Sequence, residues 1–435
     1  MNLKQLVLIQ NWLFILFPIS FIAGNLILNL HLIIFILLGC VYLIKKKTKF
    51  QHNALFLTFL LFSVILIISS IFNQFNIDKS FSYLRFFAFY VIVFYLLKEK
   101  IFNLRKIFYY YAFFVSIICI DLIIQYIFGY NIFGVEINRW RGISLGATSF
   151  FFDEQVAGSF VQSFGFYLIF YIFDKFKKNN FPNLAIKSLI ISSISISIFV
   201  SFQRMPMMVW IFFLSIYGII YYRTRLINIL SSFIIFFLFI NIFSSERSID
   251  IYKSFFTNSK VIVEKSLYSY RVNKDKKKLE KIKSDIKNIE SFVVGSGHAN
   301  LFGNALYIWQ DNKLLGVGYK KFYNKCAEKK LMRCSTHPHN YYLDVLVTTG
   351  IIGLSVLLIY LIILFSKTIS SLKFYYKKKY KEKINITLII LMNFIMIFFP
   401  FKSSGSFFTT SNAFYTTITL ALLASQLVDR PKKFL

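Results

Sequence analysis

Long apolar runs set the strongest limit on the fold of this chain. Twelve of them approach the ~20 residues that an α-helix needs to cross a hydrocarbon core of ~30 Å. They occupy residues 6–23, 25–44, 54–72, 80–97, 107–129, 156–173, 184–202, 205–222, 226–243, 341–366, 384–401 and 409–427. The 435-residue chain is 57% hydrophobic and 20% aromatic, which argues against a water-soluble domain. We therefore predict an all-α, polytopic integral membrane protein with about 12 transmembrane helices and one large external loop.

Positive charge gathers in the connections between these runs. The formal net charge is +31. Alternate connections and the C-terminus carry the basic clusters, at residues 45–49, 98–106, 175–178, 223–225, 367–383 and 430–433. Lys and Arg are retained on the cytoplasmic side of membrane proteins, so we expect both termini to be cytoplasmic. No nucleic-acid-binding motif accompanies the charge, so we expect no nucleic-acid partner.

This orientation divides the chain into three parts. Residues 1–243 contain nine of the predicted transmembrane helices, and residues 341–435 contain three more and a cytoplasmic tail. Residues 244–340 are polar and form the predicted periplasmic loop with short helices. Its basic residues do not contradict this side, because long segments cross the membrane largely regardless of charge.

Two of the five histidines lie where this loop meets the next apolar run, in the segment 336–340, THPHN. Nine residues separate Asn340 from Gly350, and two separate Gly350 from Gly353. This spacing resembles the signature of the O-antigen ligase and O-antigen polymerase superfamily of membrane glycosyltransferases. Other segments are similar to motifs of that superfamily, and the resemblance covers roughly residues 139–410: these segments are 139–142, 152–158, 201–206, 315–322 and 402–408.

The resemblance implies an O-antigen ligase-like glycosyltransferase of the bacterial inner membrane. It would transfer a glycan from undecaprenyl diphosphate to an acceptor hydroxyl, a sugar of the lipid A core, on the periplasmic side. Its partners would be this donor, the acceptor and membrane lipid, and it would need no cofactor and no metal ion. The alternatives are an O-antigen polymerase, whose acceptor is a second lipid-linked glycan, a protein O-oligosaccharyltransferase, and a polysaccharide or lipid transporter. The chain lacks the matching halves that many transporters show.

His339 and Arg204 are the predicted catalytic residues. An imidazole ordinarily titrates near neutrality, so the neutral ring of His339 is available to accept the proton of the acceptor hydroxyl. Arg204 ends the segment 201–204, which is similar to the superfamily's Ser-x-x-Arg motif. The resemblance assigns that arginine to the diphosphate, which a guanidinium can bind through two parallel hydrogen bonds. An arginine that only reaches toward the membrane surface is the alternative.

Further residues are predicted to bind the substrate: Arg141, Asp153, Glu154, Arg247, His337 and Asn340. Arg141 and Arg247 would assist Arg204 with the phosphates, and the acidic pair would accept hydrogen bonds from sugar hydroxyls. An acidic pair at a helix start also stabilises the helix by itself. His337 precedes Pro338 and has a second interpretation, as a residue that shapes the turn.

Cys326 and Cys334 lie in the predicted external loop, just before the histidine motif. In an oxidising compartment we expect them to form a disulfide, and closing so short a loop stabilises by roughly 2.5 kcal/mol. A metal site made of these two cysteines with His337 and His339 is the alternative.

The glycines of the motif carry a prediction about helix packing. In a continuous helix, Gly350 lies about three turns from His339 on the same face. Gly350 and Gly353 are then expected to let another helix approach closely. Thr348 stands where many members of the superfamily carry a glutamate, so no acidic role is predicted at that position.

Overall fold

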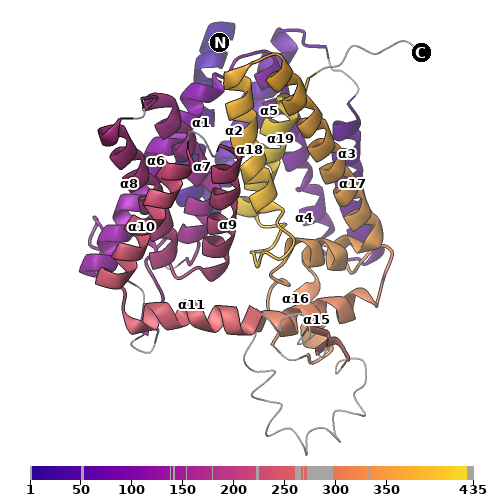
Figure 1. The fold of residues 1–435 in the computed structure, drawn as a ribbon. Helices are drawn as coiled ribbons and strands as arrows, with labels where there is room; N and C mark the ends of the chain where they lie inside the picture. The colour runs from indigo at the N-terminus through magenta and orange to yellow at the C-terminus, as the bar shows by residue number, and fades with distance from the viewer. Residues whose placement is uncertain are drawn as a thin grey trace, which may run out of the picture.

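The computed structural model describes residues 2–49, 53–137, 139–140, 143–152, 154–178, 180–221, 225–259, 266–267, 269–271, 297–331 and 333–428. Within these residues the architecture is helical, which confirms the predicted all-α class (Figure 1). The helices are α1 (Leu3–Ile22), α2 (Asn25–Lys45), α3 (Ala54–Phe72), α4 (Ile77–Phe81), α5 (Leu84–Lys98), α6 (Leu104–Phe128), α7 (Ala157–Lys175), α8 (Phe181–Val200), α9 (Arg204–Ile220), α10 (Leu226–Phe243), α11 (Glu246–Ser259), α15 (Gly297–Trp309), α16 (Phe322–Glu328), α17 (Tyr341–Lys377), α18 (Lys381–Ile397) and α19 (Thr410–Ser425). The described strands are β1 (Arg139–Trp140) and β2 (Ile143–Ser144), one antiparallel pair, and Ser149–Phe151 form a 3₁₀ turn.

Helices occupy all twelve predicted spans. Eight of the candidate spans are long and apolar enough to cross a membrane by length and composition alone: α1, α2, α3, the α4–α5 segment, α6, α8, α10 and α17. The other four are α7, α9, α18 and α19. Three of these carry buried polar side chains, such as Gln162 on α7, Asn393 on α18 and Thr417 on α19. These three helices are packed among other helices, where polar groups are tolerated better than on a lipid-facing surface.

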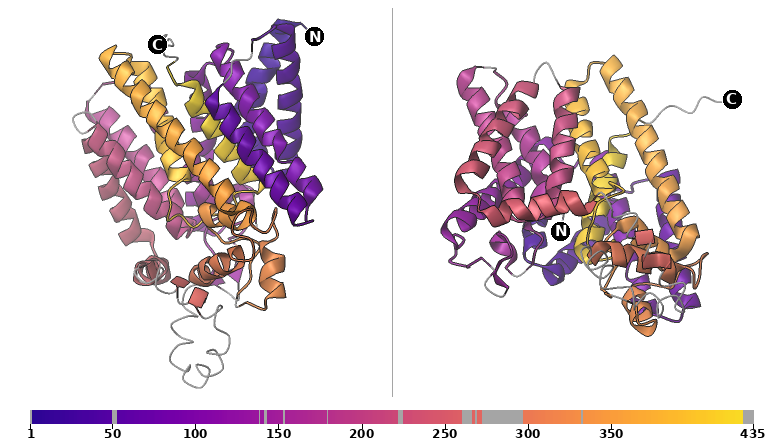
Figure 2. Two further views of the ribbon diagram at one scale, coloured as in Figure 1. Left: turned by 90° about the vertical axis from the view of Figure 1, so that its right-hand side faces the viewer. Right: turned by 60° about the horizontal axis from the view of Figure 1, so that its bottom comes forward.

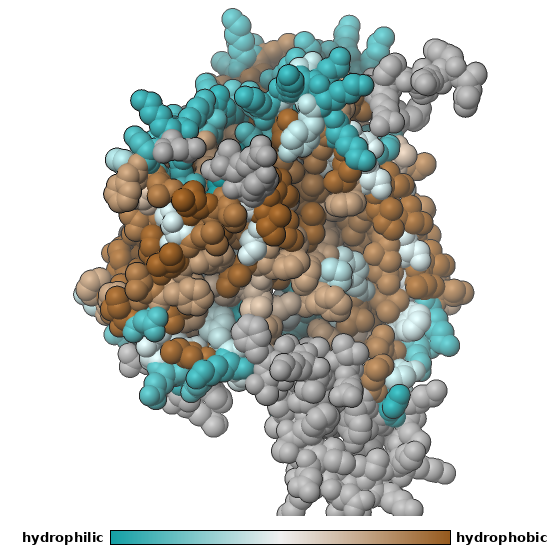
Figure 3. Space-filling view, in the orientation of Figure 1, coloured by the Kyte–Doolittle hydropathy of each residue, from teal (hydrophilic) through white to brown (hydrophobic). Residues whose placement is uncertain are grey.

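The two ends of the bundle carry different parts of the chain. The N-terminus lies at the top in Figure 1, whereas α11, α15 and α16 of the predicted external loop lie below the bundle (Figures 1 and 2). Figure 3 shows a hydrophobic belt around the middle, with hydrophilic residues above it. Lys383 at the start of α18 is within electrostatic range of Lys98 and Lys100. Lysine-rich connections that are distant in sequence therefore meet at one end, as the charge pattern predicts.

The longest helix, α17, is broken at Gly350. This residue has φ 68° and ψ −169°, a conformation open essentially only to glycine. The segment 313–318 packs against the break and pairs the backbone groups that the break releases. The bonds run from the amides of Val317 and Gly318 to the carbonyls of Val347 and Thr348 (2.8 and 3.1 Å), and from the amides of Ile351 and Ile352 to the carbonyls of Lys313 and Leu314 (2.9 and 3.3 Å).

Both sides of this contact require glycine. A Cβ on Gly350 would lie 2.1 Å from the Leu314 carbonyl oxygen, and a Cβ on Gly316 would lie 2.5 Å from the Val347 carbonyl oxygen. The prediction that Gly350 shares a helix face with His339 and admits another helix is therefore wrong. The helix is interrupted there, and its neighbour is a loop.

Candidate active site

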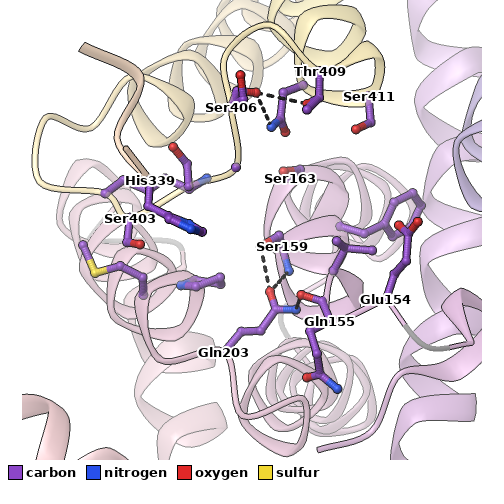
Figure 4. Close-up of a pocket in the computed structure, with 18 of the residues that line it drawn as sticks. Glu154, Gln155, Ser159, Ser163, Gln203, His339, Ser403, Ser406, Thr409 and Ser411 are labelled. Carbon is purple, nitrogen blue, oxygen red and sulfur yellow. Dashed lines mark hydrogen bonds between the residues drawn. The ribbon is translucent and has the colours of Figure 1, made fainter. Parts of the chain in front are cut away.

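A cavity of about 700 Å³ lies at the end of the bundle that carries α11 and α15 (Figure 4). Polar side chains from several connections face it, together with a smaller number of aromatic and aliphatic residues. The polar and charged members of its lining include Asn25, Glu154, Gln155, Ser159, Ser163, Gln203, Arg204, His298, His337, His339, Lys402, Ser403, Ser404, Ser406, Thr409, Ser411 and Asn412. The cavity is therefore suited to a polar or charged ligand.

Four helices without a side-chain cap begin at this cavity. Asn25 is the first residue of α2 and Arg204 the first of α9, while Val156 and Thr409 directly precede α7 and α19. None of these starts has a hydrogen bond from the side chain of its N-cap residue. The positive ends of four helix dipoles thus converge on one space, and this arrangement favours a bound anion.

A sharp reversal between α8 and α9 presents Arg204. Phe202 within this reversal has φ +57°. Ser201 lies so close to its neighbours that a Cβ on Gly158 would be 2.2 Å from its Oγ, and one on Gly146 would be 2.6 Å from its carbonyl oxygen. The small residues therefore allow the reversal to pack directly against the start of α7.

Gln203 links the start of α9 to the start of α7. Its Oε1 accepts hydrogen bonds from the amide and the Oγ of Ser159 at 2.8 and 2.7 Å, and its Nε2 donates to the carbonyl of Gln155 (Figure 4). Arg204 follows directly, is half-buried, and has its guanidinium carbon 5.9 Å from the centroid of the Phe255 ring. Among the ion pairs of the described residues none involves Arg204, so its charge is available to a ligand.

The histidine motif and the turn 402–408 are joined through the backbone. The amide of Ser404 donates to the carbonyl of His339 at 2.9 Å. Asn340 caps α17 with its Oδ1, while its Nδ2 donates to the carbonyls of Pro400 and Lys402 at 2.8 and 3.3 Å. The His339 backbone, at φ +60°, is thereby held against this turn.

Asp344 holds the other end of the same turn. The carboxylate is buried and accepts hydrogen bonds from the Oγ of Ser406 at 2.7 Å and from the amide of Phe407 at 2.9 Å. An acidic residue within a membrane span is a functional candidate by default. Here the two hydrogen bonds of Asp344 give it a structural role, because they connect α17 to the turn.

Three histidines meet beside this turn. The ring centroids of His337 and His339 are 4.1 Å apart, and that of His298, from α15, is 5.0 Å from His339. Burial is the main cause that lowers the pKa of each ring. The neighbouring charge of His339 adds to it, and the pKa of His298 and of His337 falls to about 4. The pKa of His339 is also below its ordinary value. All three rings are therefore neutral at neutral pH.

Neighbouring hydroxyls orient the rings. The Nε2 of His339 lies 3.3 Å from the Oγ of Ser335, and the Nδ1 of His337 lies 2.9 Å from the Oγ1 of Thr336. The Nε2 of His337 is buried and has no hydrogen-bond partner among the residues that the structure describes. A neutral, oriented His339 at a polar cavity has the properties of a general base.

The disulfide between Cys326 and Cys334 is confirmed, with their Cα atoms 5.7 Å apart. Cys326 is fully buried in a small apolar cluster that also contains Leu301 of α15 and Val347 of α17. The bridge thus lies between the helices that carry His298 and the residues after His339. Because the two sulfurs are bonded to each other, they are not available for the alternative metal site. The described residues contain no group of three His, Cys, Asp or Glu side chains placed to hold a metal ion.

The predicted binding residues are placed differently from one another. His337 and Glu154 line the cavity with His339 and Arg204, and Glu154 is exposed. Arg141 and Asp153 lie outside the described residues. Two others stand apart from the cavity lining. Arg247 is exposed in the first turn of α11, and Asn340 has its side-chain atoms engaged by the protein.

Two basic side chains of the cavity, those of His298 and Lys402, were not among the predicted site residues. His298 lies far from the motif in sequence, and only the packing of α15 brings it to His339. Lys402 stands in a segment that resembles a superfamily motif, but its charge drew no prediction. The side chain is only 9% exposed, and burial lowers its pKa to about 8. The sequence did contain one indication for Lys402, because a lysine stands there in a short turn between two apolar runs.

Residues 188–359 match a family model described as O-Antigen ligase. The matched segment contains Arg204, His298, His337 and His339. No curated protein matches the chain.

Proposed function

We propose that this chain, whose residues 188–359 match the O-antigen ligase family model, acts as a member of the O-antigen ligase superfamily and transfers a glycan from undecaprenyl diphosphate to a hydroxyl of the lipid A core. The reaction takes place at the cavity, on the periplasmic side of the inner membrane. The observation that carries this proposal is the presence of Arg204 and His339 on the wall of one cavity at which four uncapped helices begin.

Arg204 and the helix starts hold the leaving group of the donor. A diphosphate diester is doubly anionic, so it is bound by a guanidinium and by unpaired amides at helix N-termini. As the bond from the anomeric carbon to the diphosphate oxygen breaks, its electron pair stays on that oxygen. The same cationic groups stabilise the added negative charge, and this lowers the barrier.

His339 activates the acceptor. Its neutral ring takes the proton of the acceptor hydroxyl while the hydroxyl oxygen forms a bond to the anomeric carbon, and the proton then passes to water. Attack from the face opposite the leaving group inverts the anomeric configuration. In the proposed step, side chains of the protein supply the positive charge that stabilises the leaving group. The step assigns no role to a metal ion.

Replacement of His339 tests the proposal. In purified membranes supplied with undecaprenyl-diphosphate-linked glycan and lipid A core, His339→Ala should reduce transfer by about 10²- to 10⁴-fold, the usual contribution of a general base. Tyr323→Ala is the control, because Tyr323 is exposed on α16 and lies outside the cavity lining. Transfer by His339→Ala at the control rate would end the proposed mechanism.

The same assay identifies the acceptor and the class of protein. Glycan attached to lipid A core is the product of a ligase, whereas longer chains that remain on undecaprenyl diphosphate are the product of a polymerase. Transfer by the purified protein without an ion gradient excludes a transporter as the source of the activity. In a deletion strain, loss of all O-antigen from lipid A supports the ligase, and a single repeat on lipid A supports the polymerase.

A further inference from the structure

We propose that Lys402 is the second cation that binds the diphosphate of the lipid-linked donor, together with Arg204 in the wall of the same cavity. This inference rests on the proposed function, because it assigns a ligand to the same cavity. It differs from the sequence-based expectation, which gave the second cation as Arg141 or Arg247.

Lys402 is a buried cation held in a fixed place. It lines the cavity with a side chain that is 9% exposed. Its amide donates to the carbonyl of Phe399 at 3.0 Å, and its carbonyl accepts from Nδ2 of Asn340 at 3.3 Å. The backbone of Lys402 is therefore anchored on both sides, so that its position is determined by α17 and α18.

No acid of the described residues neutralises this ammonium. The ion pairs found there do not include Lys402. Asp344, the buried acid that contacts the same turn, is bonded to Ser406 and Phe407. Glu154 lines the cavity but is exposed and forms none of these ion pairs. Burying a charge without a partner costs free energy, and a bound anion would offset this cost by pairing with the ammonium of Lys402.

The positions around Lys402 fit a diphosphate. Lys402 and Arg204 both line the cavity, and Figure 4 shows the neighbours of the two cations in sequence, Ser403 and Gln203, facing the same space. The uncapped starts of α9 and α19 line the same space. An anion with two phosphate groups can contact two cations in one cavity at once. Lysine binds phosphate as a point charge and arginine binds it through its fork, so both side chains suit this ligand.

Lipid binding without any acceptor tests this assignment directly. The full-length protein in nanodiscs is titrated with undecaprenyl diphosphate, undecaprenyl phosphate and undecaprenol. We expect Lys402→Met to weaken binding of undecaprenyl diphosphate by about 10- to 100-fold, as for the loss of one charged hydrogen-bond partner. Binding of undecaprenyl phosphate should weaken less, because Arg204 alone can hold one phosphate, and binding of undecaprenol should not change.

Two matched variants separate charge from structure. Lys402→Arg keeps the charge and should bind undecaprenyl diphosphate within a few-fold of the unmodified protein. Lys330→Met removes an exposed lysine outside the cavity lining and should have no effect. Equal binding of undecaprenyl diphosphate by Lys402→Met and the unmodified protein would overturn the assignment. So would a loss that extends equally to undecaprenol, since that result indicates a damaged fold.

This result is independent of the proposed chemistry. His339→Ala should bind undecaprenyl diphosphate normally, because the proton acceptor does not hold the leaving group. If His339→Ala transfers glycan at the normal rate while Lys402→Met fails to bind the diphosphate, the catalytic proposal fails and the lysine assignment stands. If the unmodified protein does not bind undecaprenyl diphosphate, the donor itself is wrong and both proposals are overturned.

Discussion

Two amide side chains place the charged and titratable residues of the cavity. Gln203 fixes the start of α9 against α7, and Asn340 fixes the turn 400–402 against α17. Asn340 was predicted to bind substrate because it is part of the histidine motif. Its bonds support a different role, as a positioning residue for His339 and Lys402. A residue next to a catalytic residue in sequence can bind the substrate or can position the catalytic residue. The sequence alone does not distinguish these two roles.

The histidine pKa values lead to a prediction about acid pH. His339 must be neutral to accept a proton, and burial lowers its pKa below the ordinary 6.5. As the pH falls, the ring stays neutral until the pH reaches this lowered pKa. We therefore expect kcat/KM for transfer, which reports the free enzyme, to fall with a midpoint below 6.5. A midpoint at or above 6.5 would contradict a buried base at this position.

The alkaline side of the same profile belongs to Lys402, whose pKa is lowered to about 8. Above this pH the side chain loses its charge, so kcat/KM should fall, and Lys402→Arg should remove this fall. The other ionisable side chains that line the cavity are Glu154, Arg204, His298, His337, Tyr341 and Tyr415. A fall that persists unchanged in Lys402→Arg would assign it to one of these groups.

Sequence reasoning reached His339, His337, Arg204 and Glu154 because each belongs to a local motif, and all four line the cavity. It missed the place of His298, whose position depends on how α15 packs against the start of α17. No local pattern records such a contact. Arg247 was favoured for lying near the membrane, but distance from the membrane does not decide which side of α11 faces the cavity. Among the side chains of α11 that the structure describes, Phe255 lines it.

At the scale of elements, the broken α17 was beyond prediction from hydropathy. The run of apolar residues continues through Gly350, so its pattern indicates an uninterrupted helix. What breaks the helix is a partner segment, 313–318, that replaces its hydrogen bonds. The two glycine motifs, Gly350 and Gly316-Val317-Gly318, are the two halves of one contact. Each half alone has little meaning, which explains why the prediction for Gly350 was wrong and why no structural role was predicted for Gly316-Val317-Gly318.

Substitution of Gly350 tests the importance of this break. Gly350→Ala adds a Cβ 2.1 Å from the Leu314 carbonyl oxygen, in a conformation that L-residues avoid. We expect it to lower the apparent unfolding temperature in detergent strongly, by the equivalent of roughly 2 to 4 kcal/mol. Gly129→Ala is the matched control, since Gly129 also has a positive φ, of +87°, but no atom lies within 4 Å of its added Cβ. Similar effects of the two substitutions would show that the contact with 313–318 contributes little.

At the scale of the whole molecule, the helix positions and the two ends of the bundle were predictable. Hydropathy and charge bias act on each segment separately, so they can be read without knowledge of packing. The helices α7, α18 and α19 show the limit of this approach. They lie at predicted spans but do not qualify as membrane spans on hydropathy and length. Helices α18 and α19 have only 17 and 16 residues, and all three helices carry buried polar residues that lower their hydropathy.

Labelling of single cysteines tests the orientation. In a variant with Cys40→Ser, we introduce Lys47→Cys between α2 and α3, or Lys313→Cys in the segment before α17; both lysines are exposed. A membrane-impermeant maleimide applied to intact spheroplasts should label Lys313→Cys, while Lys47→Cys should react only after the membrane is opened. The positive-inside rule is the physical reason. The reverse pattern would place the cavity at the cytoplasmic face.

The contact between segment 313–318 and the break in α17 at Gly350 also has a consequence for biosynthesis. An unpaired peptide group in hydrocarbon costs several kcal/mol, so a broken helix cannot enter a membrane alone without a penalty. Segment 313–318 is translated before α17, and the predicted orientation puts it across the membrane when α17 leaves the ribosome. The backbone groups of segment 313–318 that bond to α17 around Gly350 are thus synthesised before α17 is inserted. We therefore expect the order of the two segments along the chain to allow the backbone groups at Gly350 to be paired while α17 inserts.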